Sequence, residues 1–179
     1  MCRLYITDDG TIIAPAIIRI PAINFVAPIL RDNPLVTAIK PTEDNVAFIV
    51  DTGAQVTCIS GLDADRLHIE SRYLEPAQDV IGVGGTCSAF KLSDIEIGLI
   101  DKIESDRITF HIEKLDYVYV LGDLKMMSLL GTDLLRKFDL VTKRSTSSAE
   151  LKRISSAPGE FHIVSREIII KTKKRLPKK

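Results

Sequence analysis

The sequence around one carboxyl group, that of Asp51, indicates a positioned and reactive side chain rather than a solvated one. Residues 48–58 read FIVDTGAQVTC, so an apolar run delivers Asp51 directly into a Thr-Gly turn and then resumes. Gly53 permits a tight turn that brings backbone N–H groups close to this carboxylate, because glycine lacks a Cβ atom. The hydroxyl of Thr52 can donate inward and hold the turn. The segment therefore indicates a positioned carboxylate, of the kind that exchanges protons during catalysis.

Other kinds of catalytic site find little support. The three histidines, His68, His111 and His162, are isolated, and no Ser or Cys lies in a recognisable nucleophile motif, so a catalytic triad is not indicated. The three cysteines are scattered and lack ligand spacing, which argues against a disulfide framework and a zinc site. Cys58 and Cys87 can lie near each other, and we interpret them as small buried hydrophobic residues rather than as a redox switch. No metal and no organic cofactor is expected.

Two further motifs follow the Asp-Thr-Gly turn. About 30 residues downstream the chain carries Ile81, Gly82, Val83, Gly84 and Gly85. This glycine-rich segment is not a phosphate loop, because it lacks the Gly-Lys-Ser/Thr ending and a following helix. About 45 residues further on, residues 129–135 read LLGTDLL. We interpret this run as an apolar strand that passes through a glycine into a helix.

The three motifs, in this order, resemble those of the aspartic peptidases, and among them the retroviral and retroviral-like family. The active-site triplet of that family is Asp-Thr-Gly followed by Ala. Asp51, Thr52, Gly53 and Ala54 match it residue for residue. The resemblance covers residues 46–138 and is thin outside them.

The resemblance also implies roles for the two downstream motifs. Residues 81–85 would form a flap that closes over a peptide bound in extended form, whereas the alternative is a plain glycine-rich β-turn. The run at 129–135 would pack beneath the active-site loop. The residues in that supporting role are Leu130, Gly131, Thr132 and Asp133.

A single carboxylate is only half of the catalytic pair that the resemblance implies. Asp123 has no Thr-Gly turn after it, and Asp133 lies at a predicted helix start, where capping explains it. A two-lobed, pepsin-like enzyme would be nearly twice as long. The second carboxylate is therefore expected to be Asp51 of another copy, in a two-fold symmetric homodimer. The resemblance further implies that the Thr52 hydroxyls interlock across the two-fold axis.

The chemistry follows from the pairing of carboxylates. Two carboxyl groups about 3 Å apart repel each other when both are ionised, so the pair shares one proton. One group then acts as the base and the other as the acid. The resemblance thus implies an aspartic endopeptidase that hydrolyses peptide bonds of proteins or peptides with an activated water. Ala54 offers no hydroxyl to the carboxylate, which implies a pH optimum less acidic than that of pepsin. The alternative function is a catalytically inactive dimerisation or peptide-binding module of the same fold, but the intact triplet argues for the enzyme.

The elements that must position these residues are predicted to be mainly β-strands. Short runs rich in Ile and Val lie between turn signals. They cover residues 11–20, 35–39, 46–50, 90–100, 107–112, 117–121 and 161–170. A short helix is predicted at 61–67 and a stronger one at 132–138, with Thr132 as its N-terminal cap. The resemblance implies a single-lobe, retropepsin-like fold with a closed, barrel-like core and one short conserved helix.

Length and composition predict one domain. The chain has 179 residues, 45% hydrophobic and 27% charged, which is ordinary for a globular protein. We place the protease domain at residues 1–142 and a basic C-terminal extension at 143–179, formed by a loop at 145–159 and a possible strand pair. The extension carries 11 basic and three acidic side chains, a net charge of +8, whereas residues 1–142 carry −8. The tail at 171–179 can contact nucleic acid, although we favour a solvated terminus.

No membrane association is predicted. The apolar stretch at 11–30 contains three prolines and Arg19, which a membrane-spanning helix would not tolerate. Asp8 and Asp9 lie where a secretory signal would be basic and then apolar. We therefore expect a cytoplasmic protein.

Overall fold

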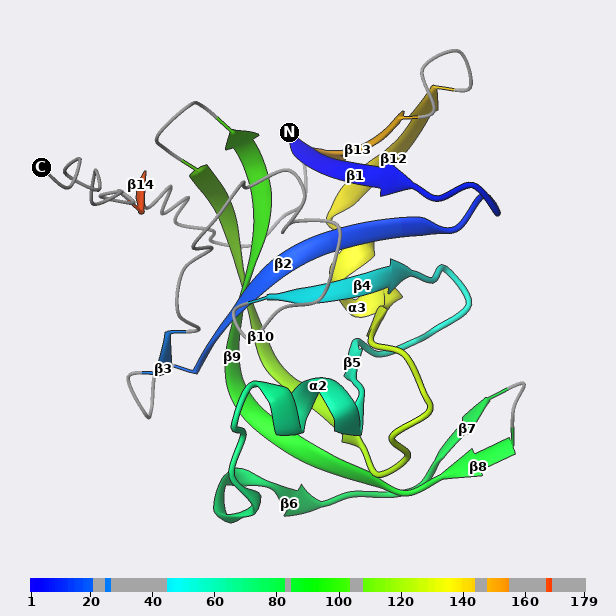
Figure 1. Ribbon diagram of the computed structural model, residues 1–179, viewed down its shortest axis with the longest axis vertical. Coiled ribbons are helices and arrows are strands. Elements are labelled where there is room, and N and C mark those ends of the chain that lie inside the picture. The colour runs from blue at the N-terminus through cyan, green and yellow to red at the C-terminus, as the bar shows by residue number, and fades with distance from the viewer. Residues whose placement is uncertain are drawn as a thin grey trace, which may run out of the picture.

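The structure is a computed structural model that describes residues 1–20, 25–26, 45–82, 85–103, 108–143, 148–154 and 167–168. These residues form mainly β-strands with two short α-helices, as predicted (Figure 1). The strands are β1 (Cys2–Ile6), β2 (Ile12–Ile20), β3 (Phe25–Val26), β4 (Val46–Val50), β5 (Cys58–Ile59), β6 (Glu75–Pro76), β7 (Val80–Gly82), β8 (Gly85–Cys87), β9 (Ala89–Ile103), β10 (Ile108–Leu121), β11 (Leu129–Leu130), β12 (Phe138–Lys143), β13 (Ser148–Arg153) and β14 (Glu167–Ile168). The helices are α2 (Gly61–Arg66) and α3 (Thr132–Leu135), and a 3-10 turn covers Ser71–Tyr73.

Most strands belong to one sheet, in the order β12-β13-β1-β2-β4-β11-β5-β10-β9-β6. The strand β2 pairs with four neighbours, with β1 and β4 through its first half and with β9 and β3 through its second half. Two parallel pairs, β4 with β11 and β5 with β10, bring together segments that lie far apart in the sequence. A closed, barrel-like core, as expected from the resemblance, stays a prediction.

The core lies under the strand that leads to Asp51. The apolar periodicity of the strands places one set of side chains inside, and burial of that set provides the main stabilising free energy. Fully buried members include Phe48 of β4, Ile59 of β5, Ile97 of β9 and Leu130 of β11. Packing of these side chains thus holds β4 in place independently of its polar contacts.

The strand predictions agree with the structure where it describes the chain. The runs at 11–20, 46–50 and 90–100 correspond to β2, β4 and β9. The runs at 107–112 and 117–121 are parts of one long strand, β10, because the polar residues between them continue the pairing with β9. The run at 35–39 and most of the run at 161–170 lie outside the described residues.

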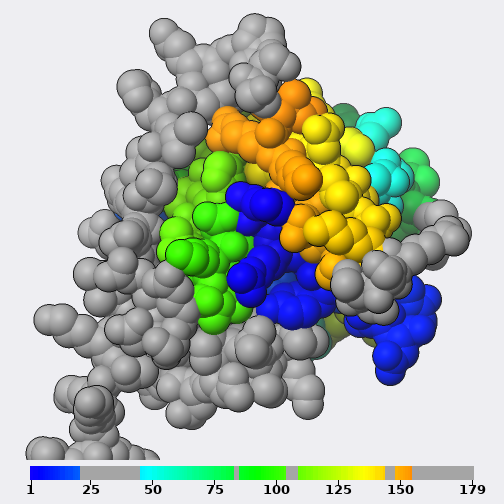
Figure 2. Space-filling model, turned by 90° about the horizontal axis from the view of Figure 1, so that it is seen from above, coloured from blue at the N-terminus to red at the C-terminus, as the bar shows by residue number. Residues whose placement is uncertain are grey.

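Two predictions about the second half of the chain were wrong. The helix expected at 132–138 ends at Leu135, and its cap is Gly131 rather than Thr132, because the Thr132 hydroxyl donates to the carbonyl of Ala54 instead. Phe138 already starts β12. The loop expected at 145–159 contains β13, which pairs with both β1 and β12 (Figure 2, orange beside blue and yellow). Its polar composition hid the strand, since only Ala149 and Leu151 face the core.

In the part of the chain that the structure describes, no helix is long and apolar enough to cross a membrane. The predicted boundary between a domain at 1–142 and an extension at 143–179 stays a prediction. The basic tail at 171–179 lies outside the described residues.

Candidate active site

Asp51 follows the last residue of β4 and is held from the backbone. Its N–H donates to the carbonyl of Leu130 at 3.1 Å, and two residues earlier the N–H of Ile49 donates to the carbonyl of Ser128 at 2.9 Å. These bonds continue the parallel pairing of β4 with β11. The apolar strand and its neighbour thus carry Asp51 to the point where the chain turns.

The carboxylate of Asp51 is bound by its own turn. The N–H of Gly53 donates to Asp51 Oδ1 at 2.8 Å, and the N–H of Ala54 donates to the carbonyl of Asp51 at 3.3 Å. A Cβ atom at Gly53 would lie 3.2 Å from the same Oδ1, so a larger residue would crowd the carboxylate. This is the close backbone approach that the sequence predicted.

The residues that follow the turn, Ala54 and Gln55, are hydrogen-bonded to the start of α3. The N–H of Thr132 donates to the carbonyl of Ala54 at 2.8 Å, and its hydroxyl donates to the same oxygen at 3.1 Å. The N–H of Asp133 donates to the carbonyl of Gln55 at 3.3 Å. The run at 129–135 therefore contacts the Asp-Thr-Gly loop directly, through hydrogen bonds as well as packing.

Thr57 and Asp133 form a second link between the loop and the helix. The backbone N–H of Thr57 donates to Asp133 Oδ2 at 3.0 Å, and its hydroxyl donates to Oδ1 at 2.7 Å. The hydroxyl also accepts from the N–H of Gly131 at 3.1 Å. Thr57 has no exposed surface, so every polar atom there needs a partner. Sequence reasoning missed Thr57, although a Thr resuming an apolar run after the turn was a visible signal.

Gly131 is required by the tightness of this contact. A Cβ atom at this position would lie 2.5 Å from the carbonyl carbon of Val56 and 2.8 Å from the backbone N of Thr57. No real Cβ approaches backbone atoms so closely, and neither atom belongs to a flexible side chain. The glycine in LLGTDLL thus allows the loop after Asp51 and α3 to meet.

Thr52 lies at the exposed tip of the turn. The inward hydrogen bond expected from its hydroxyl is not among those formed by the described residues. Asp51 is partly exposed, whereas the only other predicted candidate near it, Asp133, has its carboxylate occupied by Thr57. Within the described part of one chain, the turn therefore presents one carboxylate and one free hydroxyl toward solvent.

The glycine-rich segment forms a hairpin. Strands β7 and β8 pair from Val80 with Cys87 to Gly82 with Gly85, and Ile81 is 81% exposed. Val83 and Gly84 lie outside the described residues. Figure 1 shows the hairpin projecting on the same side of the molecule as the loop between β4 and β5.

The thiols of Cys58 and Cys87 belong to one small apolar cluster at the base of this hairpin. Burial, with smaller contributions from Asp133 and Cys87, raises the pKa of the Cys58 thiol to about 11. A thiol with so high a pKa carries little thiolate at neutral pH. This fits the interpretation of Cys58 as a small buried hydrophobic residue. Among the described residues, no group of three or more His, Cys, Asp or Glu could hold a metal ion.

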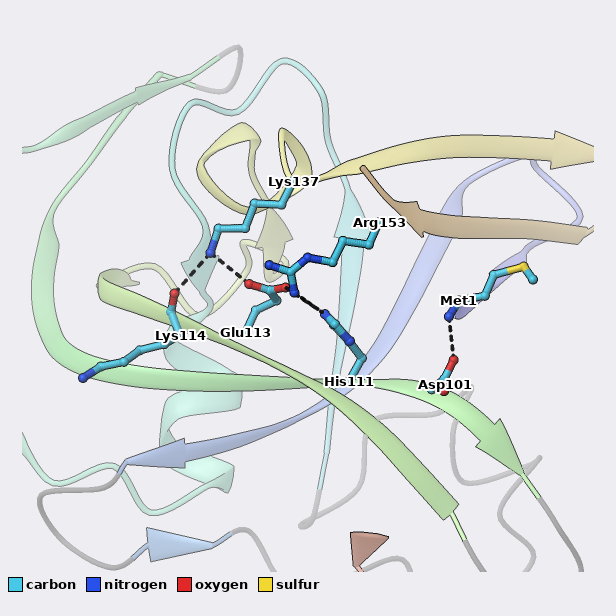
Figure 3. Close-up of polar contacts among 7 residues, drawn as sticks. All are labelled: Met1, Asp101, His111, Glu113, Lys114, Lys137 and Arg153. Carbon is cyan, nitrogen blue, oxygen red and sulfur yellow. Dashed lines mark hydrogen bonds and ion pairs between the residues drawn. The ribbon is translucent and has the colours of Figure 1, made fainter. Parts of the chain in front are cut away.

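A buried ionic cluster, which sequence reasoning also missed, joins the end of β13 to β10 (Figure 3). Glu113 of β10 is 2% exposed and contacts Lys137 Nζ at 3.0 Å, Arg153 Nη1 at 2.9 Å and His111 Nε2 at 2.7 Å. Burial raises the pKa of Glu113, but hydrogen bonds from His111 and Lys137 and the nearby positive charges outweigh it, so the net pKa is lowered. The cluster connects β10, β13 and the segment after α3.

A comparison with protein-family models finds one family whose model spans these motifs. The family model described as gag-polyprotein putative aspartyl protease matches residues 39–137. The match covers more than half of the chain and includes the Asp-Thr-Gly turn, the hairpin and the run at 129–135. The chain belongs to this family of aspartyl proteases. The resemblance to retropepsin-like proteases that the sequence indicated is thereby confirmed.

Solved structures similar to this family member include three proteases or protease-like domains. A retropepsin-like aspartic protease from Rickettsia conorii is 19% identical, with 82% of this chain and 94% of that chain covered and a TM-score of 0.46. The retroviral protease-like domain of Ddi1 from Leishmania major is 18% identical (62% and 81% covered, TM-score 0.42). The EIAV protease in complex with the inhibitor HBY-793 is 21% identical (52% and 78% covered, TM-score 0.37). No curated protein matches the chain.

Proposed function

We propose that this aspartyl protease family member is an active endopeptidase whose catalytic carboxylate is Asp51. The observation that supports the proposal best is the Gly53 N–H bound to Asp51 Oδ1 at 2.8 Å, on a loop fixed to α3. Such a loop holds the carboxylate in one geometry, which is what general acid–base catalysis requires. Thr52, Gly53 and Ala54 shape the loop, and the residues from Leu130 to Asp133 support it from below.

The site is complete only when two copies meet. Each chain supplies one Asp51, and the exposed turn with its free Thr52 hydroxyl is available to an identical turn of a second copy. A two-fold symmetric homodimer would bring the two carboxylates together, and their mutual repulsion would keep one of them protonated. The Thr52 hydroxyls would then interlock across the axis.

The paired carboxylates would divide the chemistry. The ionised Asp51 takes a proton from a water molecule, and the water oxygen attacks the carbonyl carbon of the scissile peptide. The protonated Asp51 donates a hydrogen bond to the developing oxyanion, and a proton passes to the leaving nitrogen as the C–N bond breaks. The β7–β8 hairpin, with Ile81, Gly82, Val83, Gly84 and Gly85, would close over the extended substrate as a flap.

The test compares wild type with Asp51→Asn on a denatured protein substrate between pH 4 and 7.5. Asparagine keeps the acceptor for the Gly53 N–H but cannot exchange protons, so we expect a loss of cleavage with the fold and the dimer retained. Sedimentation measures the dimer in both proteins, and a pepstatin-type inhibitor should block the wild type only. Equal cleavage by both proteins would overturn the assignment of Asp51. Peptide binding without cleavage by either would favour the inactive binding module.

Ala54 supports a pH optimum less acidic than that of pepsin, because no hydroxyl at this position stabilises the charged carboxylate. A cytoplasmic location would suit such an optimum, and both remain part of the proposal. Contact of the basic tail with nucleic acid is not proposed.

A further inference from the structure

A cavity lies against the end of β4, the strand that leads to Asp51. Its volume is about 440 Å³, enough for a large amino-acid side chain. Three apolar side chains, Ile13, Ile49 and Met127, form one part of the lining, and the turn between β1 and β2, residues 7–11, forms the other. Figure 1 shows that this turn and the end of β4 project on the same side of the molecule.

The apolar part of the cavity is tied to the catalytic strand. Ile49 lies two residues before Asp51, so both side chains leave the extended chain on the same side. Ile13 pairs with Ile49 across β2 and β4, and Met127 precedes Ser128, whose carbonyl accepts from the Ile49 N–H. A side chain held in this cavity therefore belongs to a peptide that passes close to Asp51.

The turn at 7–11 gives the cavity a negative rim. Thr7 donates its hydroxyl to Asp9 Oδ1, and the N–H of Thr11 donates to the same oxygen at 3.0 Å. The bond from Thr7 is the main cause of a lowered pKa of Asp9, so this carboxyl is ionised at neutral pH. Asp8 is exposed next to it. None of the described residues that line the cavity is basic.

We propose that this cavity binds a lysine or arginine side chain of the peptide substrate, next to the scissile bond. The inference rests on the proposed protease function and adds a substrate class to it. The aliphatic stem of the substrate residue would pack on Ile49 and Met127, and its cationic end would reach Asp8 and Asp9. Long basic side chains suit such a site, because they bury their methylene groups while the charge stays at a polar rim.

A neutral apolar side chain fits this cavity less well. It would gain the contacts with Ile49 and Met127, but it would gain no attraction from the two carboxylates at the rim. Residues 1–142 carry a net charge of −8, which attracts any cationic peptide. This general attraction must be distinguished from the local contact with Asp8 and Asp9. A matched control with the same change in net charge can separate them.

The experiment uses a synthetic peptide library in which each position around the cleaved bond is occupied in turn by lysine, norleucine or glutamate. Norleucine keeps the stem of lysine and lacks the charge. For the wild type we expect lysine to be preferred over norleucine at one position beside the cleaved bond. In Asp8→Asn/Asp9→Asn the preference should fall by up to about five-fold for each carboxylate, since exposed ion pairs contribute up to about 1 kcal/mol each. Asparagine at position 9 keeps the acceptor for Thr7 and Thr11, so the turn is retained.

The control is Asp65→Asn/Asp139→Asn, which removes two exposed carboxylates on α2 and β12, outside the cavity lining. It should keep the wild-type ratio of lysine to norleucine. An unchanged ratio in the cavity variant, or an equal fall in the control, overturns the proposal while Asp51-dependent cleavage still supports the protease. If no protein cleaves, binding of the lysine and norleucine peptides to the same variants is measured by fluorescence anisotropy. An equal affinity of the wild type for both peptides then overturns the proposal as well.

Discussion

Thr57 donates both its backbone N–H and its hydroxyl to the carboxylate of Asp133, at 3.0 Å and 2.7 Å. The residues are 76 positions apart in sequence, and both are close to the Asp-Thr-Gly turn without belonging to it. Each bond has a carboxylate acceptor and a donor on the fully buried Thr57, and such bonds contribute more there than on the surface. The pair therefore fixes the exit of the Asp51 loop to the start of α3.

We predict that Thr57→Val lowers the free energy of unfolding by about 1 to 3 kcal/mol. Valine keeps the shape of threonine but leaves the Gly131 N–H without an acceptor and removes a donor to Asp133. Urea denaturation measures the change, and proteolytic activity should fall with it because the Asp51 loop loses a support. Thr57→Ser keeps the hydroxyl and is the matched control. Equal stability of the Val and Ser variants would show that the hydroxyl contributes nothing.

A second prediction concerns Gly131. Gly131→Ala places a Cβ atom 2.5 Å from the carbonyl carbon of Val56, so the loop or α3 must shift. We expect a loss of stability of about 2 kcal/mol or more, as for other overpacked sites. Gly82→Ala is the control, because a Cβ atom there meets nothing within 4 Å and the backbone is not left-handed. Thermal unfolding of both variants tests the prediction, and similar melting temperatures would contradict it.

The sequence predicted the parts of this site that depend on local pattern. An apolar run before Asp51 and a glycine two residues after it were enough to indicate a turn whose backbone approaches the carboxylate, and the structure contains that contact. The glycine of LLGTDLL was also recognisable as a strand-to-helix junction. In both places the geometry depends on residues close together in the chain.

The parts that sequence reasoning missed depend on contacts between distant segments. The hydrogen bonds between Thr57 and Asp133, and the ionic cluster around Glu113, exist only because the sheet brings these residues together. The sequence predicts a loop where the structure has β13, because this strand has no apolar pattern of its own. Its stability comes from pairing with β1 and β12. A single sequence contains no direct signal for such pairings.

The cysteines should differ in reactivity. Burial raises the pKa of Cys58 to about 11 and that of Cys2 to about 12, whereas Cys87 is partly exposed. Because the thiolate is the reactive form, iodoacetamide at pH 8 should modify Cys87 first and leave the other two thiols protected in the folded protein. Mass spectrometry of digested samples taken over time measures the order. In 6 M urea all three should react alike, and early modification of Cys58 without urea would contradict its burial.

The cluster around Glu113 predicts how stability depends on pH. In the folded protein the pKa of Glu113 is lowered from its ordinary value of 4.5. The stabilising contribution of Glu113 is therefore fully present above pH 4.5 and is lost as the pH falls through the lower pKa of the folded state. Glu113→Gln leaves Lys137 and Arg153 without this carboxylate and should cost about 3 kcal/mol at pH 7, as for other broken buried pairs. Denaturation at several pH values should show this difference shrinking as the pH falls below 4.5. Asp116→Asn, an exposed change on the same strand, should behave like the wild type throughout. A difference that stayed constant until the protein unfolds in acid would mean that ionisation of Glu113 does not account for its contribution to stability.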